Sequence, residues 1–150
     1  MANTNTLTHA HDLIAPPHTS QQESKGESED AETNPYQILL RLGEIYVGFI
    51  GDAVGNLHHT ILLPGDSDEA LWEDQMEWAK SIGGDLPNRI EQAMLWANHR
   101  DQFKKDWYWS NETHHSKSGW AWSQRFSHGT QNDGTRLNEL RARAVRRLPI

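Results

Sequence analysis

Two pairs of adjacent histidines, His58-His59 and His114-His115, are the residues most suggestive of metal chemistry in this sequence. Neighbouring residues in a strand point to opposite faces, so neither pair chelates an ion by itself. A metal site would need a third ligand from elsewhere in the chain, such as His128 or Asp133. Solvated or hydrogen-bonded histidines are the simpler interpretation, and we predict that no metal is bound.

A run of carboxylates that follows Pro64-Gly65 offers oxygen ligands suited to a hard cation. The same acids suit the first turn of a helix, and helix capping is the favoured interpretation. The sequence contains no phosphate-binding or dinucleotide-binding glycine motif and no ordered Ser, His and Asp triad. We therefore predict a protein that is not an enzyme and has no cofactor. The carboxylates concerned are Asp66, Asp68, Glu69 and Glu73.

Large rings alternate with small or polar residues around Trp107, Trp109, Trp120 and Trp122. A period of two predicts two strands, each with one buried face. Residues 111–119 between these strands are polar, and we expect them to form a loop. Turn-forming residues at positions 128–134 predict a second loop.

The last apolar residues of the chain alternate with arginines and predict a final strand. We expect Arg141 and Arg143 on this strand to point to water or to pair with the acidic helix. The formal net charge of −7 excludes the dominant basic field that nucleic-acid binding usually needs, so we expect no nucleic-acid partner.

The tryptophans fall into two groups. Trp72, Trp78, Trp96, Trp107 and Trp109 are expected in the core. The strand with Trp120 and Trp122 must turn one side outward, and its rings lie among polar residues that suit recognition of a protein or glycan. The alternative is an ordinary packed strand with a solvated loop. The candidate ligand-binding residues are Asn111, His114, His115, Trp120, Trp122, Gln124, Phe126, His128, Gln131, Asn132 and Asp133.

Residues 1–34 are polar and acidic, and they include Pro16-Pro17 and a block rich in Ser and Glu. This composition buries too little apolar surface to fold alone. We expect an arm that is flexible or ordered by a partner, followed by one domain over residues 35–150. The sequence contains no cysteine, no apolar run of membrane-spanning length and no secretion signal at its start, so we expect synthesis in the cytoplasm and no membrane insertion.

Residues 44–50 and 57–63 predict a hairpin, with Ile45, Val47 and Phe49 on one face. Residues 36–42 before it could be a short helix or a lead-in strand. Two helices follow the hairpin, and together with the later strands they predict an α+β domain.

The first helix is expected to begin at caps among Asp66, Ser67 and Asp68, and to end near Ile82 at Gly83-Gly84. Its inward residues are expected to be Leu71, Trp72, Met76 (or Gln75) and Ala79. The second helix begins at Asn88, with Glu91 completing a capping box, and ends around residues 99–102. Its inward residues are expected to be Ile90, Met94, Leu95 and Ala97.

Four ordered motifs resemble a C-type-lectin-like domain family that is widespread in bacteria and their phages. Gly83 to Gln92 reads Gly-Gly-x-Leu-Pro-x-Arg-x-Glu-Gln, and Trp107 to Ser110 reads Trp-Tyr-Trp-Ser. Ala121 to Gln131 reads Ala-Trp-x-Gln-x-Phe-x-x-Gly-x-Gln, and Arg141 to Arg147 reads Arg-Ala-Arg-Ala-Val-Arg-Arg. The resemblance extends over residues 43–148.

The resemblance implies small antiparallel sheets with two flanking helices and long loops, and a pairing of the first and last strands. Relatives in fold include formylglycine-generating enzymes and the variable receptor-binding proteins of phage diversity-generating systems. The former use cysteines, which this sequence lacks, and the calcium signatures of lectins are absent too. Neither that activity nor calcium-dependent sugar binding is therefore expected.

These patterns together predict a noncatalytic phage or prophage binding module. We expect it in the virion, as a capsid decoration or tail protein, made in the host cytoplasm. Its arm would hold phage structural proteins, its loops would contact a host-surface protein or glycan, and it would form a homo-oligomer. The alternative is an intracellular phage effector that binds and inhibits a host defence protein in the host cytoplasm.

Overall fold

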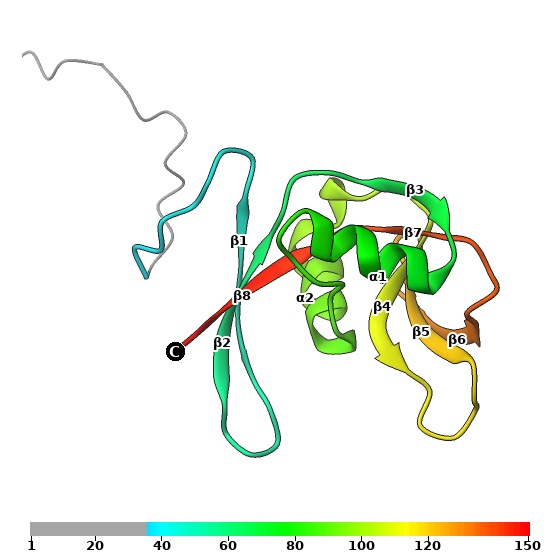
Figure 1. The fold of residues 1–150 in the computed structure, drawn as a ribbon. Coiled ribbons are helices and arrows are strands. Elements are labelled where there is room, and N and C mark those ends of the chain that lie inside the picture. The colour runs from blue at the N-terminus through cyan, green and yellow to red at the C-terminus, as the bar shows by residue number, and fades with distance from the viewer. Residues whose placement is uncertain (1–35) are drawn as a thin grey trace, which may run out of the picture.

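A computed structural model describes residues 36–150, so the predicted arm over residues 1–34 lies outside the described residues. The described part is α+β, as predicted, with two α-helices and two small, mostly antiparallel sheets (Figure 1). The helices are α1 (Trp72–Ser81) and α2 (Arg89–His99), and a short 3-10 turn, Arg100–Gln102, follows α2.

The three-stranded sheet has the order β1-β2-β8 and contains β1 (Ile45–Gly51), β2 (Leu57–Leu62) and β8 (Val145–Pro149). The predicted hairpin of β1 and β2 is confirmed. The last strand pairs with β2 and not with β1, which corrects the pairing that the resemblance implied. Residues 36–42 form neither of the expected elements, because they contain only a turn and irregular backbone.

A bulge in β1 breaks the predicted one-face alternation of the hairpin. The register shifts between Tyr46 and Gly48, so Val47 is buried while Phe49 remains largely exposed. Phe49 packs edge-on against Tyr36 on the outer side. The extra residue of a bulge turns the following side chains to the other face, which a strict period of two does not anticipate.

The five-stranded sheet has the order β3-β7-β4-β5-β6. Its central strands β4 (Trp107–Thr113) and β5 (Trp120–Arg125) are the two strands predicted from the tryptophans. Both loop predictions were wrong in part, because residues 114–119 and 128–130 lie outside the strands as expected but the neighbouring residues do not. Residues 111–113 continue β4, and the supposed turn run contains β6 (Gln131–Thr135), which pairs with β5 over its whole length. Cross-strand pairing overrides the turn preference of these polar residues.

The first helix begins later than predicted, because Ser67–Ala70 forms strand β3 and pairs with β7 (Leu140–Ala142). Leu71 holds the cap position of α1 without a side-chain hydrogen bond, so the predicted caps at residues 66–68 were wrong.

The capping box of α2 is confirmed, since Asn88 accepts from the Glu91 amide and Glu91 accepts in return. On α2 only Leu95 of the expected inward residues is fully buried, with Met94 partly buried. Ile90 and Ala97 are exposed, whereas Glu91 and Gln92 are the buried residues of the first turn of α2.

The predicted final strand is interrupted, and its two arginines face inward. Arg141 and Arg143 are each only 8% exposed. Arg141 donates to Asp66 and Asp68, whereas Arg143 donates to the carbonyl oxygens of Gln102 and Leu63. Distant acceptors therefore offset the cost of removing the Arg141 guanidinium from water, and for Arg143 they do so through Nη1 and Nη2 while its buried Nε has no hydrogen-bond partner among the described residues.

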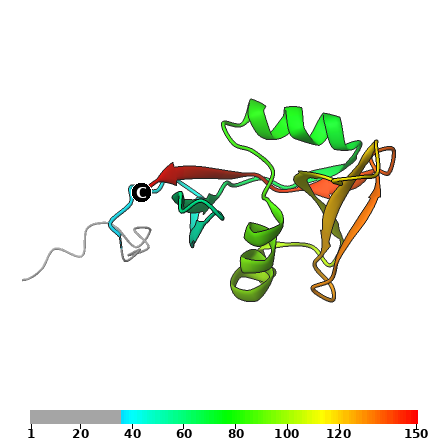
Figure 2. The ribbon, with the colours of Figure 1, turned by 90° about the horizontal axis from the view of Figure 1, so that it is seen from below.

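Two hydrophobic clusters form the core, one beneath each helix, and α1 and α2 lie on opposite sides of the β7–β8 segment (Figure 2). In the α2 cluster Leu95 packs with Tyr108 and Phe126, and in the α1 cluster Ala79 packs with Trp109. The core expectation is thus confirmed in full for Trp109. The other expected core tryptophans are only partly buried: Trp72, Trp78, Trp96 and Trp107.

Candidate functional site

The β5–β6 ribbon turns one polar and aromatic face toward the start of α2. Trp122 pairs directly with Asp133, and Gln124 pairs with Gln131. Because side chains alternate along a strand, these four lie on one face of the ribbon. Cross-strand pairing therefore gathers residues that are 7 to 11 positions apart in the sequence.

Planar side chains stack at the outer end of this face. The Arg89 guanidinium lies 3.6 Å from the centroid of the Trp122 ring. The imidazole of His114 stacks on the same indole at 5.7 Å, and His115 stacks on His114 at 4.4 Å. We call Arg89, Trp122, His114 and His115 the ring stack. It joins the first residue of α2 to β5 and to the loop after β4.

Asp133 fixes the loop of residues 114–119 over the end of the ribbon that carries the ring stack. Its carboxylate accepts from Lys117 at 2.8 Å and lies 3.5 Å from Nε2 of His114. The hydrogen bond from Lys117 lowers the pKa of Asp133 below its ordinary value. Lys117 also lies 4.5 Å above the Trp120 ring, so one lysine connects the loop to both β5 and β6.

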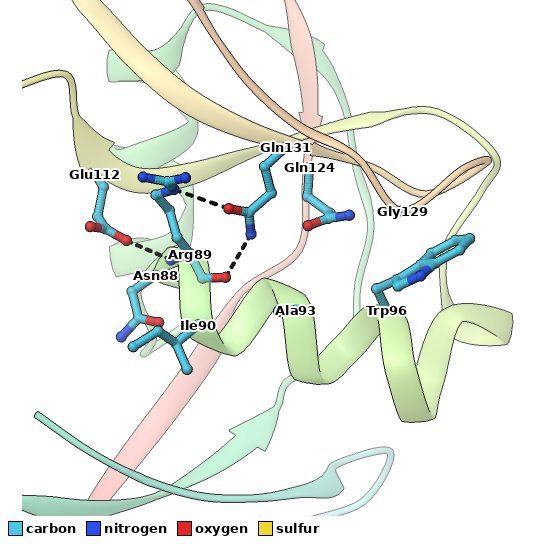
Figure 3. Close-up of a pocket in the computed structure, with 9 residues that line it drawn as sticks. All are labelled: Asn88, Arg89, Ile90, Ala93, Trp96, Glu112, Gln124, Gly129 and Gln131. Atoms are coloured by element: carbon cyan, nitrogen blue, oxygen red, sulfur yellow. Dashed lines mark hydrogen bonds between the residues drawn. The ribbon is translucent and has the colours of Figure 1, made fainter.

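Reciprocal hydrogen bonds between Arg89 and Gln131 join the start of α2 to the ribbon (Figure 3). Arg89 donates through Nε to Gln131 at 3.0 Å, and Gln131 donates back to the Arg89 carbonyl at 2.7 Å. The Arg89 amide donates to Glu112 at 2.6 Å. Asn111 strengthens the same junction by donating to Asp85 at 2.9 Å and to the carbonyl of Pro87 at 3.0 Å. The ring stack therefore rests on a junction fixed from several strands.

An open groove with a volume of about 580 Å³ runs between α2 and the ribbon. Figure 3 shows Gln131 and Gln124 pointing from their strands toward the helix. Gln124 is only 1% exposed, and its Nε2 has no hydrogen-bond partner among residues 36–150. The lining residues are Asn88, Arg89, Ile90, Ala93, Trp96, Glu112, Gln124, Gly129 and Gln131.

Gly129 sets the width of the groove at its far end. A Cβ atom at this position would lie 2.3 Å from Nε1 of Trp96, and the backbone has a φ of +80°. Both facts favour glycine, because a side chain would collide with the indole and would strain the backbone. The absent side chain lets Trp96 stand directly against the turn after β5.

A buried ion pair fixes the other side of α2 to the three-stranded sheet. Glu91 is fully buried and accepts from Nη2 of Arg147 at 2.6 Å and from Thr60 at 2.8 Å. Nε2 of His58 lies 3.2 Å from the same carboxylate. Burial raises the pKa of Glu91, but the hydrogen bonds and charge of Arg147 lower it further, so that the net shift is downward. This pair is positioned to hold the first turn of α2, and with it Arg89, in place.

Most of the predicted ligand-binding residues lie around Arg89, but three do not. Phe126 is 3% exposed and stacks on Phe103 at 3.8 Å, so it belongs to the core. Asn132 lies on the opposite face, where it lines a smaller cavity of about 170 Å³. His128 is exposed in the turn after β5, where its Nδ1 lies 2.6 Å from the Ser127 hydroxyl. The other eight lie around Arg89 or, in the case of Trp120, beside Lys117: Asn111, His114, His115, Trp120, Trp122, Gln124, Gln131 and Asp133.

Eight contributors to the ring stack and the groove were not among the predicted site residues: Asn88, Arg89, Ile90, Ala93, Trp96, Glu112, Lys117 and Gly129. One sequence signal could have found Arg89. It directly follows the Asn88 cap, so it is the first residue of α2 and can contact whatever packs against that end of the helix. Trp96 is expected in the core from the sequence, whereas the structure leaves it only partly buried beside the groove. No local pattern marks Glu112 or Lys117.

The histidine pairs form no metal site in the part of the chain that the structure describes, where no three His, Asp or Glu side chains cluster suitably. His59 instead lies 3.0 Å from the Tyr46 hydroxyl. Neither α1 nor α2 has the length and apolar character to cross a membrane.

Comparison of the sequence with models of known protein families gives no match. Comparison with curated protein sequences gives none either.

Proposed function

We propose that this protein is a noncatalytic binding module built on a C-type-lectin-like fold. The observation that carries the proposal is the ring stack, in which rigid planar groups are fixed at an open surface by partners from α2, β4, β5 and β6. A surface that is already ordered loses little entropy when it binds. The polar groups of the ring stack are largely paired with one another or with neighbouring residues. These side chains are therefore already in place when a partner binds.

The positions of the four motifs support the proposed fold. The first spans the junction from the end of α1 to the start of α2, and the second forms β4. The third covers β5 and the turn into β6, and the fourth covers β7 and the start of β8. The last strand joins the N-terminal hairpin, and the second sheet carries the exposed loop of residues 114–119. Each motif thus builds either the groove or the sheet behind it.

The proposed setting is a phage or prophage virion, with the protein as a capsid decoration or tail component. In this arrangement the acidic N-terminal arm holds phage structural proteins, copies associate as a homo-oligomer, and the ring stack meets a host-surface protein or glycan. The chain is made in the host cytoplasm and then enters the particle.

Mass spectrometry of purified particles tests this setting. The protein should be present in stoichiometric amounts and should remain after washing at high salt. Its absence from particles, together with its accumulation in the cytoplasm of infected cells, would contradict the virion assignment.

The second candidate is an intracellular effector that inhibits a host defence protein. One observation favours it: the outward side of α1 carries Glu73, Asp74 and Glu77, all exposed. A carboxylate row of this kind suits a basic partner surface. Affinity purification from infected cells separates the candidates, because the effector should recover a host protein, and the recovery should be lost when these three acids are changed to Gln, Asn and Gln.

A further inference from the structure

We propose that the groove between α2 and the β5–β6 ribbon binds an N-acetylated hexosamine, with Gln124 donating to the acetamido carbonyl oxygen. This inference rests on the proposed function, because it names a ligand class for the groove that adjoins the ring stack at Arg89. Four features of the groove support it: a buried amide without a partner, an apolar floor, the absence of net charge, and a wall whose backbone is already paired.

Gln124 supplies the unpartnered amide. Its side chain lines the groove and is 1% exposed, yet its Nε2 has no hydrogen-bond partner among the described residues. Leaving a buried donor unpaired is unfavourable, because the donor loses its hydrogen bonds to water and gains none in return. The terminal torsion of a glutamine is soft, so a rotation of the amide turns an N–H toward the groove. A ligand carbonyl oxygen placed there would remove the cost, whereas a ligand without an acceptor would not.

The floor of the groove is apolar and comes from one side of α2. Ala93 lies at its centre, Ile90 is 55% exposed on one flank, and the indole of Trp96 stands on the other. An acetyl methyl group and the C–H face of a sugar ring both suit such a floor, because aromatic and aliphatic surfaces exclude water from them. The volume of about 580 Å³ is within the range of small-molecule sites and accommodates one or two sugar rings.

The charge of the groove favours a neutral ligand. Its charged lining residues are Arg89 and Glu112, which have opposite signs. Arg89 donates through Nε to Gln131, so its Nε–Nη edge is not free for a bidentate pair with a phosphate or sulfate, and the neighbouring Glu112 carboxylate repels such anions. The remaining groups at this end, the Glu112 carboxylate and the Asn88 amide, suit hydroxyl groups, which both donate and accept hydrogen bonds.

The turn between β5 and β6, which borders the groove, offers no free backbone edge to an extended peptide, the main competing ligand. Recognition of a peptide by strand addition requires free backbone donors and acceptors along an edge. At this wall the Arg125 amide donates to Thr130, and the Gly129 amide donates to Arg125, each at 2.8 Å. The groove therefore presents side-chain amides and rings to a ligand, with the turn backbone paired internally.

Titration of the isotope-labelled full chain with N-acetylglucosamine, followed by nuclear magnetic resonance, tests the proposal. The side-chain amide of Gln124 and the indole N–H of Trp96 should shift together and saturate, with a dissociation constant on the order of 1 mM. Glucose and glucosamine, which lack the acetyl group, should bind at least about tenfold more weakly, a difference of about 1.4 kcal/mol.

Two alanines of α2 provide matched variants, since Ala93 lines the groove and Ala97, on the next turn, does not. Both are exposed, and leucine is a good helix former, so both variants should fold. Ala93→Leu should abolish saturation and Ala97→Leu should leave it unchanged. The Gln124→Glu variant, which removes the N–H donors, should lose the preference for the acetylated sugar.

The proposal is overturned if N-acetylglucosamine produces no saturable shift, if glucose binds equally well, or if only an acetylated tripeptide amide moves the two resonances. These outcomes leave the proposed function standing when the protein is still found in purified particles. Failure of both measurements would reject the binding module together with its ligand.

Discussion

The Arg89 guanidinium lies 3.6 Å above the Trp122 ring while its Nε donates to Gln131. One side chain at the start of α2 thereby holds both strands of the β5–β6 ribbon. A cation over a tryptophan contributes about 0.5–2 kcal/mol, depending on its exposure. Arg89→Ala should therefore lower the free energy of unfolding by about 1–2 kcal/mol without loss of the fold. Urea denaturation measures this change.

Arg89→Lys is the control for geometry. Lysine retains the charge but lacks the planar fork, so it cannot stack on Trp122 and donate to Gln131 in the same way. The indole resonance of Trp122 should move in the lysine variant almost as far as in the alanine variant. A lysine variant with native resonances would show that charge alone holds the ribbon.

Glu91 should control the acid stability of the protein. The pKa of this buried carboxyl is lowered in the folded state, so its ionised form stabilises the fold above the ordinary pKa of 4.5. The stabilisation is lost as the pH falls through the lower folded-state pKa. Glu91→Gln should cost about 3–5 kcal/mol at neutral pH, because it leaves Arg147 buried without its charge partner. Its unfolding free energy should also depend less on pH below 4.5 than that of the parent protein.

Thermal melts between neutral and acidic pH measure both effects. Glu77→Gln is the matched control, since Glu77 is exposed on α1 and no hydrogen bond or ion pair of its side chain is found among the described residues. Equal acid sensitivity of the two variants would contradict a structural role for the Glu91–Arg147 pair.

Tyr108 should resist deprotonation in strong base. Burial and the hydrogen bond that it donates to Asp66 raise the pKa of Tyr108 to about 12. Its neutral form therefore favours the folded state below the ordinary pKa of 10.0, and this contribution is lost as the pH rises from 10.0 to about 12. Tyrosinate absorbance should show a late-titrating group that is absent in Tyr108→Phe. Identical titration curves for the two proteins would contradict the Tyr108–Asp66 hydrogen bond.

Gly129 should tolerate no side chain. Alanine there would meet the Trp96 indole and also adopt a φ of +80°, whereas Gly55 has a similar φ of +90° with nothing within 4 Å. Gly55→Ala should cost about 1 kcal/mol from the backbone alone. Gly129→Ala should cost more and should displace the Trp96 resonance. Equal costs would show that Trp96 does not pack against this turn.

The features predicted correctly from the sequence are those with local causes. The capping box at Asn88 and Glu91 lies within four consecutive residues, and the alternation around Trp109 and Trp122 marks the positions of β4 and β5. The expected single buried face was wrong for β4, because Tyr108 and Trp109 are both buried, on opposite faces of the strand. Local hydrogen bonding and period-two alternation are legible in a single sequence. They were sufficient to predict α2, the hairpin of β1 and β2, and the central strands β4 and β5.

The errors arose where a distant partner decides the outcome. Arg141 was expected either to point to water or to pair with the acidic stretch that was assigned to a helix, and only the structure shows that it donates to Asp66, 75 positions away and outside α1. The same Asp66 was expected to cap α1. Residues 131–135 form β6 because β5 supplies a pairing edge, although the segment itself is rich in turn residues. Among the site residues, the pairing of β5 with β6 places Trp122, Gln124, Gln131 and Asp133 on one face of the ribbon. Asn132 lies on the opposite face, and the uniformly polar residues around it contain no alternation from which this could be predicted.

Retention of the purified, labelled protein on host cells tests the binding claim most directly. The parent protein and the exposed-surface control Glu77→Gln should bind saturably, and Arg89→Ala and His115→Ala should reduce retention at least about tenfold, equivalent to about 1.4 kcal/mol. Retention that is equal for all four proteins, or absent for all of them, would contradict the ring stack as the surface that holds the partner.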